Sequence, residues 1–219
     1  SCCQVRAYAF GKVILAGEHS VVHGGTAIGM PFRGMQLELS IAQSTSLQHE
    51  LVINEKRMSE SLGVLIDDAF RVLEIQPTPV RVFGSSSILL GAGLGSSAAL
   101  SVAILRLLMS YFKEPRSQQE LECCANKLER KFHGNPSGLD TAIVSQEKPI
   151  TFSRTQGPRP VVQKFRKNPW AFALIDSGAR AATKIMVDRV AGLFKGSAGK
   201  ERISAFNVCC QRIEEGLAN

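Results

Sequence analysis

The sequence predicts an α+β fold, in which strands and helices follow one another without the regular strand–helix–strand repeat of a parallel α/β protein. Short apolar runs bounded by glycine and polar residues dominate the first part of the chain, and such runs are typical of strands. Helical periodicity then takes over in the middle of the chain, and shorter strand-like runs return near residue 150. The 219 residues are enough to bury a substantial core.

In the first part of the chain, strands are expected at residues 5–9 and 13–16, separated by a glycine and a lysine. Glycines and polar residues predict a loop over residues 17–25. Apolar residues recur at helical spacing over residues 58–73, which predicts a helix. The other strands expected in this part lie at residues 34–42, 50–54 and 77–83.

A long apolar helix is expected from about residue 96 to 112, and a second helix over residues 117–132. Residues 133–138 form a tight turn by composition, because Gly-Asn-Pro-Ser-Gly is dense in turn formers. A short helix is expected to follow at residues 139–144. Further strands are predicted at 149–153, 161–164 and 171–175, and further helices at 182–194 and about 200–217.

Composition excludes several classes of protein. Hydrophobic residues make up 44% and charged residues 21% of the chain, which is ordinary for a globular domain. No apolar run approaches the roughly 18–20 residues that span a membrane, and no secretion signal is recognisable. We therefore expect a cytoplasmic protein without a membrane partner.

The cysteines and the net charge give no sign of metal or nucleic-acid binding. The six cysteines fall in three adjacent pairs, and neighbouring cysteines cannot clamp one metal as a CxxC pair does. The net charge is +7, but no basic stretch alternates with aromatic residues. We expect reduced, packing cysteines and no nucleic-acid partner. A basic surface also suits a polyanionic small molecule.

The stretch that carries most chemistry is Gly-Ala-Gly-Leu-Gly-Ser-Ser-Ala-Ala at residues 91–99. A glycine loop that enters a helix directs free backbone N–H groups and the positive end of the helix dipole at an anion. The alternative is a glycine turn before a tightly packed alanine-rich helix, and the stretch is not a Walker A loop. The candidate phosphate-binding residues are Gly91, Ala92, Gly93, Leu94, Gly95, Ser96 and Ser97.

A second stretch places two carboxylates around the tight turn. Glu129 lies at the end of the preceding helix and Asp140 lies just past the turn. One carboxylate could hold a metal while the other accepts a proton from a substrate hydroxyl. The alternative is a surface turn with two solvated acids.

The third stretch covers residues 11–24. Lys12 is a positive charge beside a glycine, and Glu18 and His19 lie in a glycine-bounded loop. His19 and His23 are four residues apart, as in a helical zinc pair, but the glutamate precedes the first histidine and glycines would break the helix. We expect no zinc site here.

In this order, the three stretches resemble the GHMP kinases, a superfamily that includes galactokinase, homoserine kinase and mevalonate kinase. Residues 11–24 and 133–140 are most similar to mevalonate kinase. The resemblance implies an N-terminal ATP-binding domain of the ribosomal-protein-S5-domain-2-like type over residues 1–167. It also implies the beginning of a ferredoxin-like C-terminal domain over residues 168–219, which we expect to be truncated because the family's second glycine-rich loop is missing.

The resemblance also implies ATP and Mg²⁺ as cofactors. In that comparison the loop at residues 91–97 wraps the ATP phosphates, and Ser86 lies where a nucleotide-contacting serine is expected. Ser97 and Glu129 match the Mg²⁺ ligands.

The catalytic and substrate-binding residues are implied in the same way. Asp140 matches the carboxylate that takes the proton from the substrate's primary hydroxyl, and Lys12 matches the lysine paired with it. Glu18, His19 and Thr183 match residues on the substrate side.

The implied reaction is ATP-dependent phosphorylation of mevalonate to 5-phosphomevalonate, a step of isoprenoid biosynthesis. Two alternatives stay open. Ala181 and Ala182 stand where animal mevalonate kinases carry an arginine, which favours a kinase for another small alcohol. The missing second glycine loop favours a non-catalytic fragment or a ligand-sensing relative. A homodimer is compatible with the resemblance, and the sequence leaves the oligomeric state open.

Overall fold

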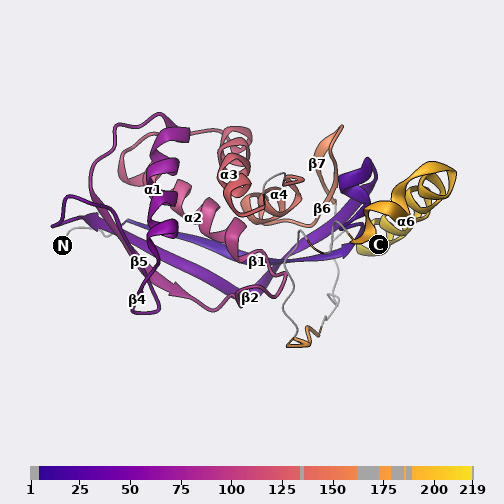
Figure 1. Cartoon of the computed structure of the whole chain (residues 1–219), viewed down its shortest axis with the longest axis horizontal. Helices are drawn as coiled ribbons and strands as arrows, with labels where there is room; N and C mark the ends of the chain where they lie inside the picture. Colours follow the sequence, from indigo (N-terminus) through magenta and orange to yellow (C-terminus); the bar gives the residue numbers. More distant parts are fainter. Residues whose placement is uncertain (1–4, 134–135, 162–172, 179–184, 186–188, 219) are drawn as a thin grey trace.

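In the computed structural model, a curved mixed sheet of seven strands carries four helices on one face (Figure 1). The structure describes residues 5–133, 136–161, 173–178, 185 and 189–218. The strands are ordered β4-β3-β5-β2-β6-β7, and β1 pairs with β2 off this path. The α+β class predicted from the sequence is confirmed.

The long strand β2 (Thr26–Gln43) is the spine of the sheet. β1 (Arg6–Ala16) runs antiparallel along one edge of β2. Along the other edge, β6 (Ile150–Ser153) pairs with the beginning of β2 and β5 (Val80–Ser86) with its end. Between those two partners, residues 30–32 and 36 of β2 pair with β1 alone.

Two strand predictions in this part were wrong. β1 is one continuous strand, because a register shift between Phe10 and Gly11 absorbs the irregularity that was expected to break it. β2 begins eight residues before its predicted start at residue 34. Pro31 has no N–H to donate, and it lies in the part of β2 that pairs on one edge only.

The remaining strands are short and lie toward the two ends of the sheet. β3 runs parallel to β5, β4 forms a hairpin with β3, and β7 pairs with β6. The predicted strand at residues 161–164 lies outside the described residues except for Val161, which has no regular structure. The described part of the predicted strand 171–175 is not a strand either. The bounds are β3 (Glu50–Ile53), β4 (Lys56–Arg57) and β7 (Gly157–Pro160).

Four helices cover the sheet, and each was predicted to within two residues at both ends. The apolar faces of α1, α2 and α3 pack with side chains of the sheet into the main core, whereas α4 packs mostly in a second cluster with the beginning of β2 and with β6. The middle helix α2 is buried over most of its length, as its alanine-rich sequence allows. The bounds are α1 (Glu60–Leu73), α2 (Ser96–Tyr111), α3 (Gln118–His133) and α4 (Leu139–Gln146).

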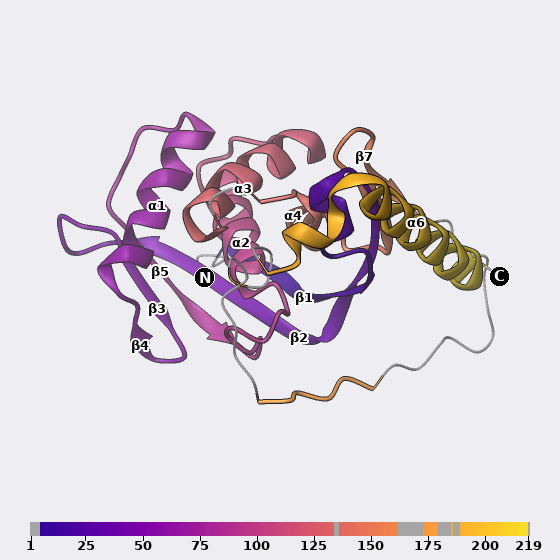
Figure 2. The same cartoon turned by 45° about the vertical axis from the view of Figure 1, so that its right-hand side comes forward.

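The helix α6 (Gly196–Ala218) lies at the end of the molecule away from β3 and β4 (Figure 2). Side chains alternate across β2, so Ala27 packs in the cluster of α4 whereas Ile28 packs against Cys210 and Leu217 of α6. Both faces of this part of β2 are therefore covered.

Several predictions about the C-terminal part fall largely outside the described residues. The helix expected at residues 182–194 is described at residues 185 and 189–194, where it ends in the 3₁₀ helix η2 (Gly192–Phe194). The expected domain boundary at residues 167 and 168 lies in a stretch that the structure does not describe, so it stays a prediction. Within the described residues, no helix has the length and apolar character needed to cross a bilayer.

A half-buried histidine, His49, joins the sheet to α1. The His49 ring stacks on Phe70 at 5.2 Å between ring centroids, and its Nδ1 accepts the backbone N–H of Val80 at 3.2 Å. Its Nε2 lies 3.3 Å from Asp67 Oδ1. Burial lowers the pKa of His49, and the nearby Asp67 opposes this only in part.

We predict that this histidine makes the fold acid-sensitive. The unfolded chain binds the His49 proton more readily than the folded chain, so the free energy of unfolding should fall as the pH drops below about 6.5. Urea unfolding between pH 7.5 and pH 5 should show a smaller loss of stability in His49→Gln than in the unmodified chain. Equal pH slopes for the two proteins would contradict this role.

Candidate active site

The loop between β5 and α2 has the backbone conformation of an open anion cradle. Gly91, Gly93 and Gly95 adopt positive φ angles of 67°, 75° and 73°, which side chains other than glycine rarely allow. A Cβ atom on Gly93 would meet no atom within 4 Å, so the loop is not packed shut. α2 has neither an acidic residue in its first turn nor a side-chain cap. Its N-terminal N–H groups and dipole are therefore available to an anion.

Lys12 fastens this loop to the sheet. Its backbone N–H donates to the Leu94 carbonyl at 2.9 Å. Its side chain passes so close to Gly95 that a Cβ there would lie 2.6 Å from Lys12 Cγ. The lysine is only 3% exposed, and its Nζ lies 3.0 Å from Asp140 Oδ1. One residue thus joins the loop to the carboxylate expected to be catalytic.

Asp140 lies in the first turn of α4, two residues after the N-cap residue Gly138. Gly138 has a φ angle of 91°, which turns the chain into the helix. The helix N-terminus and the Lys12 ammonium both place positive charge beside the carboxylate. The Asp140 side chain is 33% exposed, so it can be reached from solvent.

Glu129 is the buried acid of the site, with an exposure of 1%. It accepts hydrogen bonds from Ser97 Oγ at 2.9 Å and from Ser101 Oγ at 3.1 Å. Burial raises the pKa of Glu129 to about 7, although these two hydrogen bonds oppose the rise. Asp140 also raises the pKa of Glu129, and Lys12 lowers it. The Lys12–Asp140 pair and Glu129 therefore belong to one site.

The donor set suits a hard cation that also binds phosphate. Ser97 and Glu129 could supply two oxygen ligands, and Mg²⁺ commonly takes one or two protein oxygens and completes its shell with phosphates and water. In the part of the chain that the structure describes, no group of three or more His, Cys, Asp or Glu side chains could hold a metal. The two oxygens of Ser97 and Glu129 would suit a magnesium ion that shares its ligands with a nucleotide.

His133 was not predicted as a site residue, although it touches both of these oxygen donors. Its Nε2 lies 3.1 Å from Ser97 Oγ and 3.5 Å from Glu129 Oε2. The sequence places it four residues after Glu129, a spacing that brings two side chains onto one helix face. That spacing is the signal that could have identified it.

Ser86 lies at the end of β5, where the loop begins. Its backbone N–H donates to Asn54 Oδ1 at 2.9 Å, and its carbonyl accepts from Asn54 Nδ2 at 3.0 Å. Its hydroxyl accepts the N–H of Ile88 at 3.2 Å. These contacts fix the start of the loop, and the expected contact of Ser86 with a nucleotide stays a prediction.

The substrate-side residues are placed less completely. Glu18 is exposed, and His19 is half-buried at the start of the 3₁₀ helix η1 (Ser20–His23). Val21 of η1 packs in one cluster with Leu139, so this loop lies beside the start of α4. No hydrogen bond or ion pair among the described residues joins Glu18 or His19 to Asp140. Thr183 lies outside the described residues.

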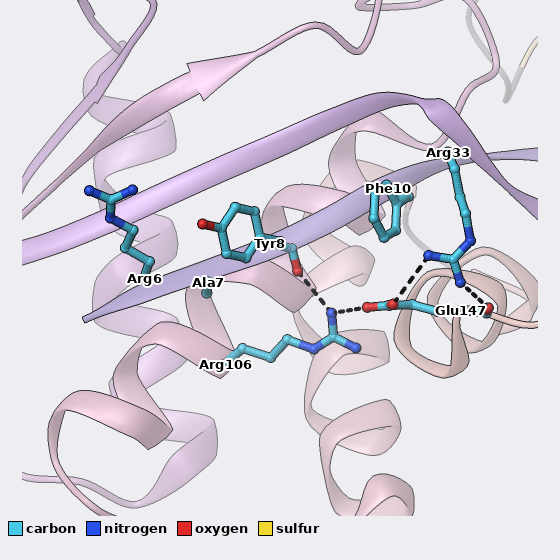
Figure 3. A pocket seen from close by; sticks show the side chains of 7 residues that line it. All are labelled: Arg6, Ala7, Tyr8, Phe10, Arg33, Arg106 and Glu147. Atoms are coloured by element: carbon cyan, nitrogen blue, oxygen red, sulfur yellow. Dashed lines mark hydrogen bonds and ion pairs between the residues drawn. The ribbon is translucent and has the colours of Figure 1, made fainter. Parts of the chain in front are cut away.

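One surface hollow, of about 470 Å³, lies elsewhere, at the free edge of β1 around Arg106 (Figure 3). None of the predicted site residues lines it. We assign the site to the loop and its charged groups, because those residues carry the chemistry that the hollow lacks.

Known proteins resemble the part of the chain that contains this candidate site. Residues 61–147, which include the loop, Glu129 and Asp140, match the family model of the GHMP kinases N terminal domain. This part of the chain is similar to the N-terminal domain of the GHMP kinases. The mevalonate kinase of Methanocaldococcus jannaschii is 25% identical over 156 residues, which cover 61% of this chain and 49% of that enzyme. The mevalonate kinase of Aeropyrum pernix is 28% identical over 200 residues, which cover 84% of this chain and 61% of that enzyme.

Solved structures share the GHMP kinase fold. The crystal structure of the Methanococcus jannaschii mevalonate kinase matches all of this chain and 74% of its own, with a TM-score of 0.76 and 18% identity. The L. major mevalonate kinase in complex with R-mevalonate matches 99% of this chain and 69% of its own, with a TM-score of 0.74 and 21% identity. The sequence alignments span about half to three-fifths of the two archaeal GHMP kinases.

We predict that Glu129 makes the metal-free protein less stable as the pH rises. A carboxyl group whose folded pKa is raised holds its proton more tightly in the folded chain, so stability is lost between the ordinary value of 4.5 and about 7. In the presence of EDTA, Glu129→Gln should gain stability over the unmodified chain across this range, by up to about 3 kcal/mol. The measurement is urea unfolding at a series of pH values. A stability difference that does not change with pH would refute the prediction.

Proposed function

We propose that this chain forms the ATP-binding and catalytic part of a kinase that transfers the γ-phosphoryl group of ATP to the primary hydroxyl of mevalonate. The observation that carries the proposal is the position of Lys12. Its backbone holds the phosphate loop at Leu94, while its ammonium lies 3.0 Å from the Asp140 carboxylate. A phosphate on the loop and a hydroxyl at Asp140 would thereby be brought next to each other.

The phosphates of ATP would be bound by the backbone of residues 91–97. The open centre of the loop at Gly93 leaves room for the nucleotide. The first N–H groups of α2 then donate to phosphate oxygens, and the helix dipole favours their negative charge. Because Lys12 and Gly95 fix the end of the loop, these donors are oriented before the nucleotide arrives.

Asp140 would act as the general base. It accepts the proton of the substrate hydroxyl while that oxygen forms a bond to the γ-phosphorus. The bond between the γ-phosphorus and the β–γ bridging oxygen breaks, and ADP leaves with the electron pair. The Lys12 ammonium lies beside Asp140 and would stabilise negative charge on the phosphoryl oxygens during the transfer.

Ser97 and Glu129 would hold the magnesium ion. When bound, Mg²⁺ neutralises charge on the phosphates and orients them for in-line transfer. The buried Glu129 carboxylate has two hydroxyl donors, from Ser97 and Ser101, and no lysine or arginine partner among the described residues. A cation at this position would supply the missing positive charge.

Mevalonate is the acceptor that the sequence favours. Residues 11–24 and 133–140 resemble mevalonate kinase, and the curated relatives named above are mevalonate kinases. The loop that carries Glu18 and His19 lies beside the start of α4, where Asp140 accepts the proton. A kinase for another small alcohol is the second candidate, favoured by Ala181 and Ala182 in place of an arginine.

We predict that Asp140→Asn loses phosphoryl transfer but keeps nucleotide binding. The amide cannot accept the hydroxyl proton, so kcat should fall roughly 10²–10⁴-fold. The dissociation constant of an ATP analogue, measured by calorimetry, should change only a few-fold because the loop is unchanged. Glu55→Gln, which changes an exposed acid in the β3–β4 turn, is the matched control and should keep full activity. Full activity in Asp140→Asn would overturn the mechanism.

A substrate panel tests the acceptor itself. ADP release should be fastest with mevalonate and much slower with phosphomevalonate, homoserine and galactose. Preference for another alcohol would keep the superfamily chemistry and replace the substrate. Absence of ADP release with every alcohol, together with absence of ATP-analogue binding, would favour a non-catalytic relative.

A further inference from the structure

Arg106, in the second half of α2, connects three elements at once (Figure 3). Its Nη1 donates to the Tyr8 carbonyl of β1 at 2.8 Å and to Glu147 Oε1 at 2.7 Å. Its Nη2 donates to the Ser145 carbonyl at the end of α4 at 2.8 Å. We call these three hydrogen bonds the Arg106 bracket.

The bracketed elements are the ones that carry the site. β1 carries Lys12, α2 begins at the phosphate loop, and α4 carries Asp140 in its first turn. The parts of these elements that carry the candidate site meet at the Lys12–Asp140 pair. Their other ends meet at Arg106. The relative position of the three elements is therefore fixed at two places.

α4 is short enough to transmit a displacement from one end to the other. Ser145 follows Asp140 by five residues, or about 7.5 Å along the helix axis. Between them, Ile143 is packed so closely on β2 that a Cβ on Gly29 would lie 2.4 Å from its Cδ1. Release of the C-terminal end would let the helix tilt about this contact and move Asp140.

The bracket satisfies groups that would otherwise lack partners. The carbonyls in the last turn of a helix have no partner within the helix, and a cation there is favoured by the helix dipole. Arg33 supports the arrangement from β2, because its Nη2 donates to the Glu147 carbonyl at 3.0 Å while its guanidinium lies 4.8 Å from the centroid of the Phe10 ring. The arginines that line the hollow are thus engaged with the protein itself. Arg6, the third of them, pairs with Glu38.

We propose that Arg106 is a positioning residue, which sets the Asp140 carboxylate relative to Lys12 and the phosphate loop through the C-terminal end of α4. This inference rests on the proposed kinase function. A misplacement of reacting groups by about 1 Å can reduce a rate about 10²-fold, so a contact remote from the site can control kcat.

The test is Arg106→Met, which keeps most of the side-chain stem and removes the three hydrogen bonds. kcat should fall at least tenfold, while KM for ATP should change less than twofold, because Lys12 still holds the loop at Leu94. Arg106→Lys can keep one of the hydrogen bonds and should restore part of kcat. Hydrogen exchange of the amides of residues 139–147 should become faster in Arg106→Met.

Arg116→Met is the matched control. Arg116 is similarly buried, with a side-chain exposure of 28% against 24% for Arg106, and it donates to the Leu73 carbonyl at the end of α1 at 2.9 Å. Its loss should cost stability without a change in kcat or in the exchange of residues 139–147. Equal losses of kcat in both variants would mean that Arg106 acts through stability alone and would overturn the inference.

The exchange measurement separates this inference from the proposed function. Faster exchange of α4 in Arg106→Met, in a chain without kinase activity, would support the bracket and reject the function. Unchanged exchange with unchanged kcat would reject the bracket and leave the function standing. If Arg106→Met does not fold, Glu147→Gln weakens the same contact and should give a smaller change in the same direction.

Discussion

The arrangement of the site depends on one buried cation. Lys12 is almost completely withdrawn from water, and an isolated buried charge costs several kcal/mol. Its partner Asp140 offsets this cost, so the first turn of α4 must lie against β1. The same residue holds Leu94 through its backbone and packs on Gly95 through its side chain. Lys12 thereby fixes the positions of the start of α2 and the start of α4 relative to the sheet.

The second acid of the site has the opposite character. Glu129 is as buried as Lys12, but its only ion-pair partner among the described residues is the His133 ring, 3.5 Å away. Its pKa is raised mainly by loss of hydration, against two serine hydroxyls that stabilise the charged form. Asp140 thus has a lysine as its ion-pair partner, whereas Glu129 has no lysine or arginine partner among the described residues. That difference matches the division between a general base and a metal ligand.

The helices and the glycine-rich loop before α2 could be predicted from local sequence, because helical periodicity and glycine conformational freedom are properties of neighbouring residues. The strands were predicted less well for the same reason. The first residues of β2 contain Gly29 and Pro31, which weaken a strand locally, yet β1 and β6 pair with this part of the chain. The sheet that surrounds these residues overrides their intrinsic preference.

The sequence by itself determined the chemical types of the site and the order in which the chain presents them: a lysine beside a glycine, a glycine loop before a helix, and two acids around a tight turn. Resemblance to a known family was needed to pair Lys12 with Asp140, since 128 positions separate them. Only the tertiary structure showed that His133 touches the oxygens of Ser97 and Glu129 and that Asn54 clasps Ser86. It alone also brought Arg106 onto the end of α4. Such contacts join surfaces of different elements, and their positions are set by the packing of the whole core rather than by the residues next to them in the chain.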